Sequence, residues 1–247
     1  MDFVRKKPPD IVISSVSTET IDSDLAILGK IKDTLKNSVL IIFGIHASVF
    51  AEDILKNSAV DFVVRDEPEE TIRELVGALK SGLLPDAIKG ITYRSSLGQV
   101  VATGKREFVQ DLDALPFPAW DLVDLGRYRL PFSSNPFIII NTSRGCPFRC
   151  SFCNAQTYYG SSIRIRSVRN ILDELEFSTS RYGIKDVFFW GDTFTLVREQ
   201  VKNLCAGLIQ GKFRIRWVAN SRVDTVDEEI IMLMKKAGCW LLSFGIE

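Results

Sequence analysis

The first third of the chain alternates short apolar runs with amphipathic stretches. Short runs rich in β-branched side chains are typical of buried strands, whereas apolar positions three and four apart predict helices. We therefore predict strands at residues 9–15, 38–44 and 60–64, and helices at residues 24–37, 51–57 and 68–82. Because helices separate strands that are apolar on both faces, the pattern predicts a doubly wound α/β domain with a parallel sheet.

The pattern changes in the middle of the chain. Residues 88–104 (IKGITYRSSLGQVVATG) predict a β-hairpin with its turn near residues 95–98. Residues 111–122 (DLDALPFPAWDL) are rich in proline and aromatic side chains and predict an ordered connector. We expect the first domain to occupy residues 1–90, and the hairpin and connector to occupy residues 91–135.

A second alternation of strands and helices begins at residue 136. It predicts strands at residues 136–143, 184–192, 213–222 and 239–247, and helices at residues 167–183, 195–211 and 226–238. Strands that alternate with helices in this way are typical of a (β/α) barrel or part of one, which we assign to residues 136–247. A parallel sheet that stops at its fourth strand leaves an apolar edge. We therefore expect a fragment that lacks material at both ends.

Composition narrows the class of partner. Lysine plus arginine and aspartate plus glutamate number 31 each, so the formal net charge is zero and gives no attraction for nucleic acid or membrane surfaces. No apolar run approaches the ~18 residues of a membrane span, and the first ten residues lack the apolar stretch of a signal peptide. We expect a cytoplasmic protein without a membrane span or a nucleic-acid partner. In that compartment thiols stay reduced, so clustered cysteines indicate metal binding or catalysis rather than disulfides.

Three of the five cysteines lie in one short stretch, TSRGCPFRCSFC. They are Cys146, Cys150 and Cys153, directly after the first predicted strand of the barrel. One interpretation is three packed core cysteines, because free cysteine behaves as a small buried hydrophobe. A loop with a glycine and a proline among these residues is a poor place for core side chains. Metal binding is therefore the better interpretation.

Zinc is one candidate metal for these thiols. A structural zinc site requires four ligands, whereas only three are local and the single histidine, His46, lies in the other domain. Cys239 lies at the start of the fourth predicted strand, and strand starts lie at the end of a barrel opposite the loops that follow strands. A zinc site therefore remains an alternative interpretation, although the sequence offers no fourth ligand for it.

An iron–sulfur cluster agrees better with three thiolates. A [4Fe–4S] cluster is usually held by four thiolates, so three leave one iron open for a substrate or cofactor. The loop follows the C-terminal end of a barrel strand, where active sites of this architecture lie. Arg144 and Arg149 flank the thiolates and would offset the negative charge of a cluster.

The motif C-x₃-C-x₂-C, with aromatic Phe152 before its last cysteine, resembles the signature of radical S-adenosylmethionine (SAM) enzymes. The resemblance covers residues 136–247, about the first four of the six βα units usual in that family. It implies that the open iron chelates the amino and carboxylate groups of SAM. It also implies that one electron from the cluster cleaves the sulfonium to a 5′-deoxyadenosyl radical, while the protein supplies positioning. In this family Phe152 would shield the cluster and pack near the adenine.

The same resemblance implies four further SAM contacts. Gly191 and Asp192, in the turn WGDTFT, resemble the turn that contacts the amino group of SAM, although a helix N-cap formed by Asp192 or Thr193 is an alternative explanation. Arg222, in NSRVD, could clamp the SAM carboxylate or be a solvated arginine. Glu247, at the end of GIE, resembles a motif near the ribose.

Residues 10–90 resemble the cobalamin-binding domain that precedes the radical SAM domain in one large subclass. Ligands of a doubly wound sheet bind at the carboxyl ends of its strands. This implies that Ser14, Ser17, Gly44, His46 and Glu67 lie near a corrinoid, which adds cobalamin to the expected cofactors. The chain lacks the cobalt-ligating motif D-x-H-x-x-G, because Gly44 lies two residues before His46 and Val49 three after it. His46 is equally explained as a neutral loop histidine.

The resemblance implies methylation or rearrangement of an unreactive carbon in a small metabolite or lipid precursor, with flavodoxin or ferredoxin as electron donor. A methylthiotransferase acting on RNA is an alternative, although that class has three further cysteines in its first domain and this chain has none before Cys146. An electron-transfer or regulatory iron–sulfur protein and a zinc-stabilised binding module also remain open.

Overall fold

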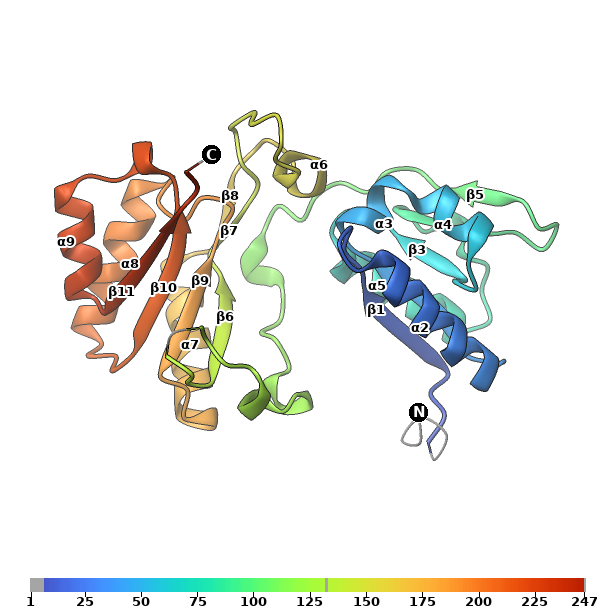
Figure 1. Cartoon of the computed structure of the whole chain (residues 1–247), viewed down its shortest axis with the longest axis horizontal. Coiled ribbons are helices and arrows are strands. Elements are labelled where there is room, and N and C mark those ends of the chain that lie inside the picture. The colour runs from blue at the N-terminus through green and yellow to red at the C-terminus, as the bar shows by residue number, and fades with distance from the viewer. Residues whose placement is uncertain (1–6, 132, 247) are drawn as a thin grey trace. The chain divides into compact units, whose positions relative to one another are not determined.

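The computed structural model describes residues 7–131 and 133–246. The chain divides into two compact units, one of Met1–Val109 with Thr157–Tyr159 and one of Gln110–Gln156 with Gly160–Glu247. Figure 1 shows an α/β arrangement in both. Among the described residues, no helix combines the length and apolar content needed to cross a bilayer.

The first unit is built on a five-stranded sheet in the order β1-β2-β3-β4-β5. Its strands are β1 (Ile11–Ser15), β2 (Val39–Phe43), β3 (Phe62–Val64), β4 (Ile91–Arg94) and β5 (Val100–Ala102). The first three strands are parallel, as predicted, whereas β4 and β5 pair antiparallel. The sheet is therefore mixed, with an antiparallel hairpin at one edge.

Helices cover both faces of this sheet because its central strands are apolar on both sides. In β2, Leu40 and Ile42 belong to one core, with side chains of α2 (Ile21–Thr34), α3 (Ile45–Val49) and α4 (Ala51–Asn57). Ile41 lies between them in sequence and faces the other core, with α5 (Pro68–Lys80). Alternate residues of a strand point to opposite faces, so one apolar strand supplies two cores and confirms the predicted α/β class.

The boundary of the first unit differs from the one that we predicted at residue 90. The hairpin of β4 and β5 extends the first sheet, with Val63 opposite Thr92 in the register, and the unit continues to Val109. Two short strands cannot form a stable sheet alone, so the hairpin pairs with the free edge of β3. The turn η1 (Pro85–Ala87) leads into it.

The connector belongs to the second unit. It contains three turns of 3₁₀-helix, η2 (Leu112–Ala114), η3 (Trp120–Leu122) and η4 (Leu125–Arg127). Trp120 and Leu125 pack against the core of the second unit. The backbone N–H of Ser167 donates to the Asp113 carboxylate at 2.9 Å. These contacts agree with the ordered connector predicted from its proline and aromatic content.

The second unit contains a four-stranded parallel sheet in the order β11-β10-β9-β6. Its strands are β6 (Phe137–Asn141), β9 (Asp186–Trp190), β10 (Arg216–Ser221) and β11 (Cys239–Phe244), joined by the helices α7 (Val168–Tyr182), α8 (Arg198–Gln210) and α9 (Glu228–Lys236). Each strand lies beside its predecessor, so right-handed crossovers place all three helices on one face. This is the winding of a (β/α) barrel, seen here over four strands.

The helix-covered face of this sheet holds the main core. Ile140, Phe189 and Trp217 are fully buried there, and the indole N–H of Trp217 donates to Ala237 O at 2.9 Å. Two of the three helices begin at side-chain caps, since the Ser167 side chain accepts from Asn170 N and the Asp227 side chain accepts from Ile230 N. The strands of the sheet are parallel, so their carboxyl ends share one edge. The loops that follow β6, β9 and β10 meet at that edge.

Candidate metal and cofactor site

The cysteine loop follows β6 and is shaped by a close approach of two backbone segments. After β6 the chain forms a two-stranded ribbon of β7 (Ser143–Arg144) and β8 (Arg164–Ile165). Gly145 has φ +89°, and a Cβ there would lie 2.3 Å from Ser162 O. Only glycine adopts this conformation at so short a distance. Gly145 therefore determines where the cysteine loop leaves the ribbon.

Three hydrogen bonds join the first half of the loop to Gln156, in the following helix α6 (Ala155–Tyr159), and to Gly160 directly after that helix. The Gln156 side-chain amide donates to Cys146 O at 3.1 Å and to Phe148 O at 2.9 Å. The backbone N–H of Cys146 donates to Gly160 O at 3.2 Å. These hydrogen bonds fix the backbone of the first half of the loop. They do not involve the cysteine side chains, which can contact other elements.

Each of the three loop thiols has a defined polar neighbour. The buried Cys146 sulfur lies 3.9 Å from Thr193 Oγ1. The half-buried Cys150 sulfur accepts from Arg222 Nη1 at 3.6 Å, and the exposed Cys153 sulfur accepts from Ala155 N at 3.5 Å.

All three are free thiols. In the part of the chain that the structure describes, no group of three or more His, Cys, Asp and Glu side chains is gathered closely enough to hold a metal ion. The predicted metal-ligand role of the three cysteines stays a prediction.

The other two cysteines have a different environment. Cys205 is fully buried in the helix-covered core, and burial raises the pKa of its thiol to about 12. Burial likewise raises the pKa of the Cys239 thiol to about 12. Because the thiolate is the metal ligand and nucleophile, neither residue is suited to ligation at neutral pH. The Cys239 side chain lies against the same core as Cys205.

The turn after β9 contacts the cysteine loop directly. Asp192 Oδ2 accepts from Gly145 N at 2.7 Å. A Cβ on Gly191 would lie 2.6 Å from Ser143 Oγ, so glycine permits close packing of the two segments. The helix after this turn begins at Arg198 with Val197 as its N-cap. The N-cap explanation of Asp192 is therefore wrong, and its carboxylate braces the loop that carries the cysteines.

Burial is the main influence on the Asp192 carboxyl and raises its pKa above the ordinary value. The hydrogen bond from Gly145 and the positive charges of Arg164 and Arg144 act in the opposite direction. The two arginines favour the ionised form of this carboxylate and offset part of its negative charge.

Arg222, after β10, makes contacts that differ from the predicted clamp. Its Nε and Nη2 donate to Asp224 at 3.0 and 2.7 Å, which occupies the edge of the guanidinium that a bidentate clamp requires. Nη1 points to Cys150, and the guanidinium lies 3.9 Å from the centroid of the Phe148 ring. It is therefore not a free, solvated arginine. Its predicted contact with SAM stays a prediction.

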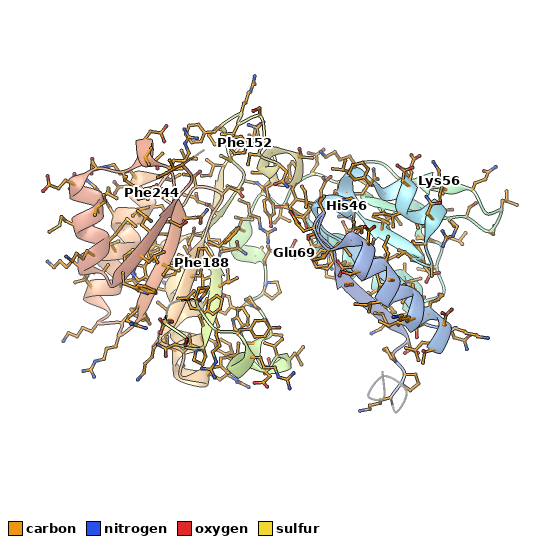
Figure 2. The ribbon with its side chains drawn as sticks, in the orientation of Figure 1. His46, Lys56, Glu69, Phe152, Phe188 and Phe244 are labelled. Carbon is orange, nitrogen blue, oxygen red and sulfur yellow. The ribbon has the colours of Figure 1, made fainter. Side chains whose placement is uncertain are left out.

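The last two predicted SAM contacts are less defined. Phe152 projects from the cysteine loop with 67% of its surface exposed (Figure 2). Its predicted shielding of a cluster therefore stays a prediction. Glu247 lies outside the described residues.

Sequence reasoning missed two polar residues of this site. Thr193, next to Asp192, faces the Cys146 sulfur. Asn220, near the end of β10, donates from Nδ2 to Gly191 O at 2.8 Å, while its buried Oδ1 has no hydrogen-bond partner among the described residues. A polar side chain at the carboxyl end of a barrel strand is the signal that could have identified Asn220.

In the first unit, the predicted cobalamin residues lie at or near the carboxyl ends of β1, β2 and β3. Gly44 has φ +123°, and a Cβ there would lie 2.2 Å from Val16 O. His46 Nδ1 lies 3.2 Å from Thr18 Oγ1, and its ring packs against Phe50 with centroids 4.7 Å apart. The loops after β1 and β2 are therefore in close contact around Gly44.

The remaining three residues of that set have local partners. Ser14 Oγ donates to Ser15 O, and Ser17 Oγ lies 3.1 Å from Thr20 Oγ1. Glu67 is buried, and its Oε2 accepts from Val109 N at 2.7 Å. A corrinoid role for these residues stays a prediction.

Comparison with known proteins agrees with this geometry. A family model described as "Radical SAM superfamily" matches residues 140–247. The chain is 34% identical over 247 residues to an uncharacterized methyltransferase of Pyrococcus horikoshii, covering 99% of this chain and 53% of that protein. It is 30% identical over 256 residues to an anaerobic magnesium-protoporphyrin IX monomethyl ester cyclase of Rubrivivax gelatinosus, covering 100% of this chain and 46% of that protein.

A solved structure shares the fold of the whole chain. It is the radical SAM methyltransferase TsrM from Kitasatospora setae with cobalamin and a [4Fe-4S] cluster bound, with a TM-score of 0.79 and 19% identity over 100% of this chain and 50% of that one. The chain spans about half the length of the curated relatives it matches. The matched residues 140–247 include the three loop cysteines, the turn after β9 and Arg222. Residues 140–247 therefore match the radical SAM superfamily, and the whole chain is similar to the proteins named above.

Proposed function

We propose that Cys146, Cys150 and Cys153 hold a [4Fe–4S] cluster, at which SAM binds, and that the chain forms part of a radical SAM enzyme. One observation carries this proposal. The three thiols lie in a loop at the carboxyl end of the first strand of a (β/α) sheet, and each sulfur has a hydrogen-bonding group within 3.9 Å. Hydrogen bonds to the sulfurs are a recurrent feature of iron–sulfur sites.

The residues present fit such a cofactor in their chemistry. Three soft sulfur ligands from one loop leave one of four irons without a protein ligand. The buried Asn220 Oδ1 provides a hydrogen-bond acceptor that no described side chain uses. Gly191 has no side chain in the narrow space beside Ser143. The space at the carboxyl ends of β9 and β10 is thus bordered by groups suited to a polar cofactor.

The chemistry supplied by a bound cluster is the one-electron reduction of the SAM sulfonium, which yields the 5′-deoxyadenosyl radical. The role of the protein is to bind and orient. Asp192 would pair with the ammonium of SAM while it braces Gly145, and Asn220 would accept a hydrogen bond from an N–H or O–H of the same ligand. Gly191 would allow the backbone to approach it closely. These roles use side chains that β9 and β10 place at one edge of the sheet.

The net reaction that we propose is methylation, linked to cobalamin, of an unreactive carbon in a small metabolite or lipid precursor. Its support is the names of relatives, since the Pyrococcus protein is called a methyltransferase and TsrM is a methyltransferase with cobalamin bound. We propose that Met1–Val109, with Gly44 and His46 at its loop edge, is the cobalamin-binding part. A flavodoxin or ferredoxin would supply the electron. A cytoplasmic location is part of the proposal, because that compartment keeps thiols reduced.

Anaerobic reconstitution with iron and sulfide tests the cluster and SAM cleavage. We expect about four irons per chain and formation of 5′-deoxyadenosine from SAM under reduction, by the four-iron stoichiometry of such clusters. A variant with all three loop cysteines replaced by alanine should lose both. The matched control replaces Cys205 and Cys239 by alanine and should keep both. Cleavage of SAM by the loop variant would overturn the assignment.

The cobalamin proposal has a separate test. Added hydroxocobalamin should remain with the protein through gel filtration and give the visible spectrum of a bound corrin. The His46→Ala variant asks whether His46 is a cobalt ligand, because loss of that ligand changes the spectrum. No bound corrin with the unaltered chain would overturn cobalamin binding but leave the cluster proposal intact.

A further inference from the structure

Arg222 differs from the other groups that contact the loop sulfurs because it is charged. Thr193 offers Cys146 a neutral hydroxyl, and Ala155 offers Cys153 a backbone N–H. Arg222 offers Cys150 a guanidinium N–H at 3.6 Å. A permanent positive charge at a sulfur ligand has a larger electrostatic effect than a neutral dipole. The contact between Arg222 and Cys150 is therefore the one most able to change the properties of a bound cluster.

Two groups determine the position of the guanidinium. Asp224 binds its Nε and Nη2 in a bidentate pair. The Phe148 ring, 3.9 Å away, lies in the same loop as Cys150 and makes a cation–π contact. Only 35% of the Arg222 side chain is exposed. An arginine held in this way loses little further entropy when it donates to sulfur.

The backbone of Arg222 is held as well. It precedes the turn η5 (Val223–Thr225), and Thr225 Oγ1 donates to Arg222 O at 2.9 Å. The same hydroxyl lies 2.5 Å from Thr195 Oγ1, which in turn contacts Ser221 Oγ. These hydroxyls connect the loop after β9 to the loop after β10. The backbone of Arg222 is thus held by contacts outside the cysteine loop.

We propose that Arg222 is a positioning residue that raises the reduction potential of the cluster through its hydrogen bond to Cys150, and that Asp224 orients it. The proposal rests on the proposed function. Reduction adds negative charge to the cluster, and a guanidinium hydrogen-bonded to a ligand sulfur stabilises that charge. The Asp224 carboxylate offsets part of the positive charge, but it pairs with the opposite edge of the guanidinium, away from the N–H that faces Cys150.

Potentiometric titration of the cluster, followed by EPR, tests this role without measuring turnover. The variants are Arg222→Gln, which removes the charge but keeps an N–H donor, and Arg222→Lys, which keeps the charge but loses the planar fork. Arg198→Gln is the matched control. Arg198 is similarly exposed at 39% and pairs with the carboxylates of Asp227 and Glu229, which lie outside the cysteine loop.

We expect Arg222→Gln to lower the equilibrium constant for one-electron reduction at least tenfold, which is a shift of about 59 mV to more negative potential. Arg222→Lys should recover part of this shift, and Arg198→Gln should match the unaltered protein. Equal potentials for Arg222→Gln and Arg198→Gln would overturn the role. The role would also be overturned if Arg222→Gln lost the cluster while Arg198→Gln and the unaltered chain kept it. Arg222 would then be required for cluster assembly and not for the reduction potential. Failure of the unaltered chain to hold a cluster would instead reject the proposed function itself.

Discussion

Asp192 Oδ2 accepts a hydrogen bond from the backbone N–H of Gly145 at 2.7 Å, and this contact joins the turn after β9 to the start of the cysteine loop. Gly145 directly precedes Cys146, so the carboxylate fixes the backbone from which the first cysteine projects. A side chain predicted to contact SAM thus also braces the candidate metal site.

Asp192→Ala should destabilise the second unit, because the Gly145 N–H in a buried backbone would lose its partner. An unsatisfied buried donor costs about 1–3 kcal/mol. Asp192→Asn is the matched control, because its amide oxygen can still accept the bond, and it should lose less. Differential scanning calorimetry of the cluster-free protein measures both. Equal melting temperatures for Asp192→Ala and the unaltered chain would show that the bond contributes nothing to stability.

Gly145→Ala should be more damaging than an equivalent change at Gly183. Both glycines have positive φ, at +89° and +66°, but a Cβ on Gly145 would lie 2.3 Å from Ser162 O, whereas a Cβ on Gly183 would meet nothing within 4 Å. Alanine at Gly183 carries only the conformational penalty, about 1–2 kcal/mol. Alanine at Gly145 must also displace the backbone. We expect a lower melting temperature and less bound iron for Gly145→Ala only, and equal losses in both variants would contradict this.

Four of the five cysteines should separate into two classes on alkylation of the cluster-free protein. Cys205 is fully buried and Cys239 is partly buried, and burial raises the pKa of each thiol to about 12. At pH 8 the thiolate fraction of such a group is about one in ten thousand, so it should react slowly with iodoacetamide. Cys150 and Cys153 are more exposed and should react first. Mass spectrometry of tryptic peptides over time measures the order, and rapid labelling of Cys205 would contradict it.

The same two thiols predict weaker folding stability at alkaline pH. Their folded pKa lies above the ordinary value of about 9, so the unfolded chain releases these protons first as pH rises. Stability from this source is complete below about pH 9 and is lost as pH rises toward 12. A variant with Cys205 and Cys239 replaced by alanine should show a smaller loss of melting temperature over that range. An identical pH profile for the variant would contradict the effect.

Glu174→Ala should destabilise the second unit strongly, because it leaves the charge of Arg166 buried without its carboxylate. Glu174 is 1% exposed, and its Oε2 accepts from Arg166 Nη1 at 2.6 Å. Breaking one side of a buried pair costs about 3–5 kcal/mol. The control lies on the same helix, where Asp173 pairs with the exposed Arg169, and Asp173→Ala should cost less than about 1 kcal/mol. Thermal unfolding compares the two, and similar losses would contradict the distinction.

The sequence by itself determined the four main strands and three main helices of the second unit, but the ribbon of β7 and β8 and the helix α6 were not predicted. Strand runs such as residues 184–192 and the helix at 167–183 carry their pattern within a few neighbouring positions, and that information is local. The three-cysteine motif could also be identified from the sequence, whereas the requirement for glycine at Gly145 comes from its close approach to Ser162 O. The hairpin was recognised as well, but its pairing with β3 was not, because a strand pattern does not name its partner.

Only the tertiary structure decided which groups contact the sulfurs. Arg222 lies 72 residues from Cys150, and Asp192 lies 47 residues from Gly145. Their meeting depends on the register of β6, β9 and β10, which brings three loops to one edge of the sheet. The choice of Asp224 and Cys150 as partners of Arg222 follows from that geometry. Local residue patterns specify elements, whereas contacts between loops follow from how those elements pack, and packing is a property of the whole fold.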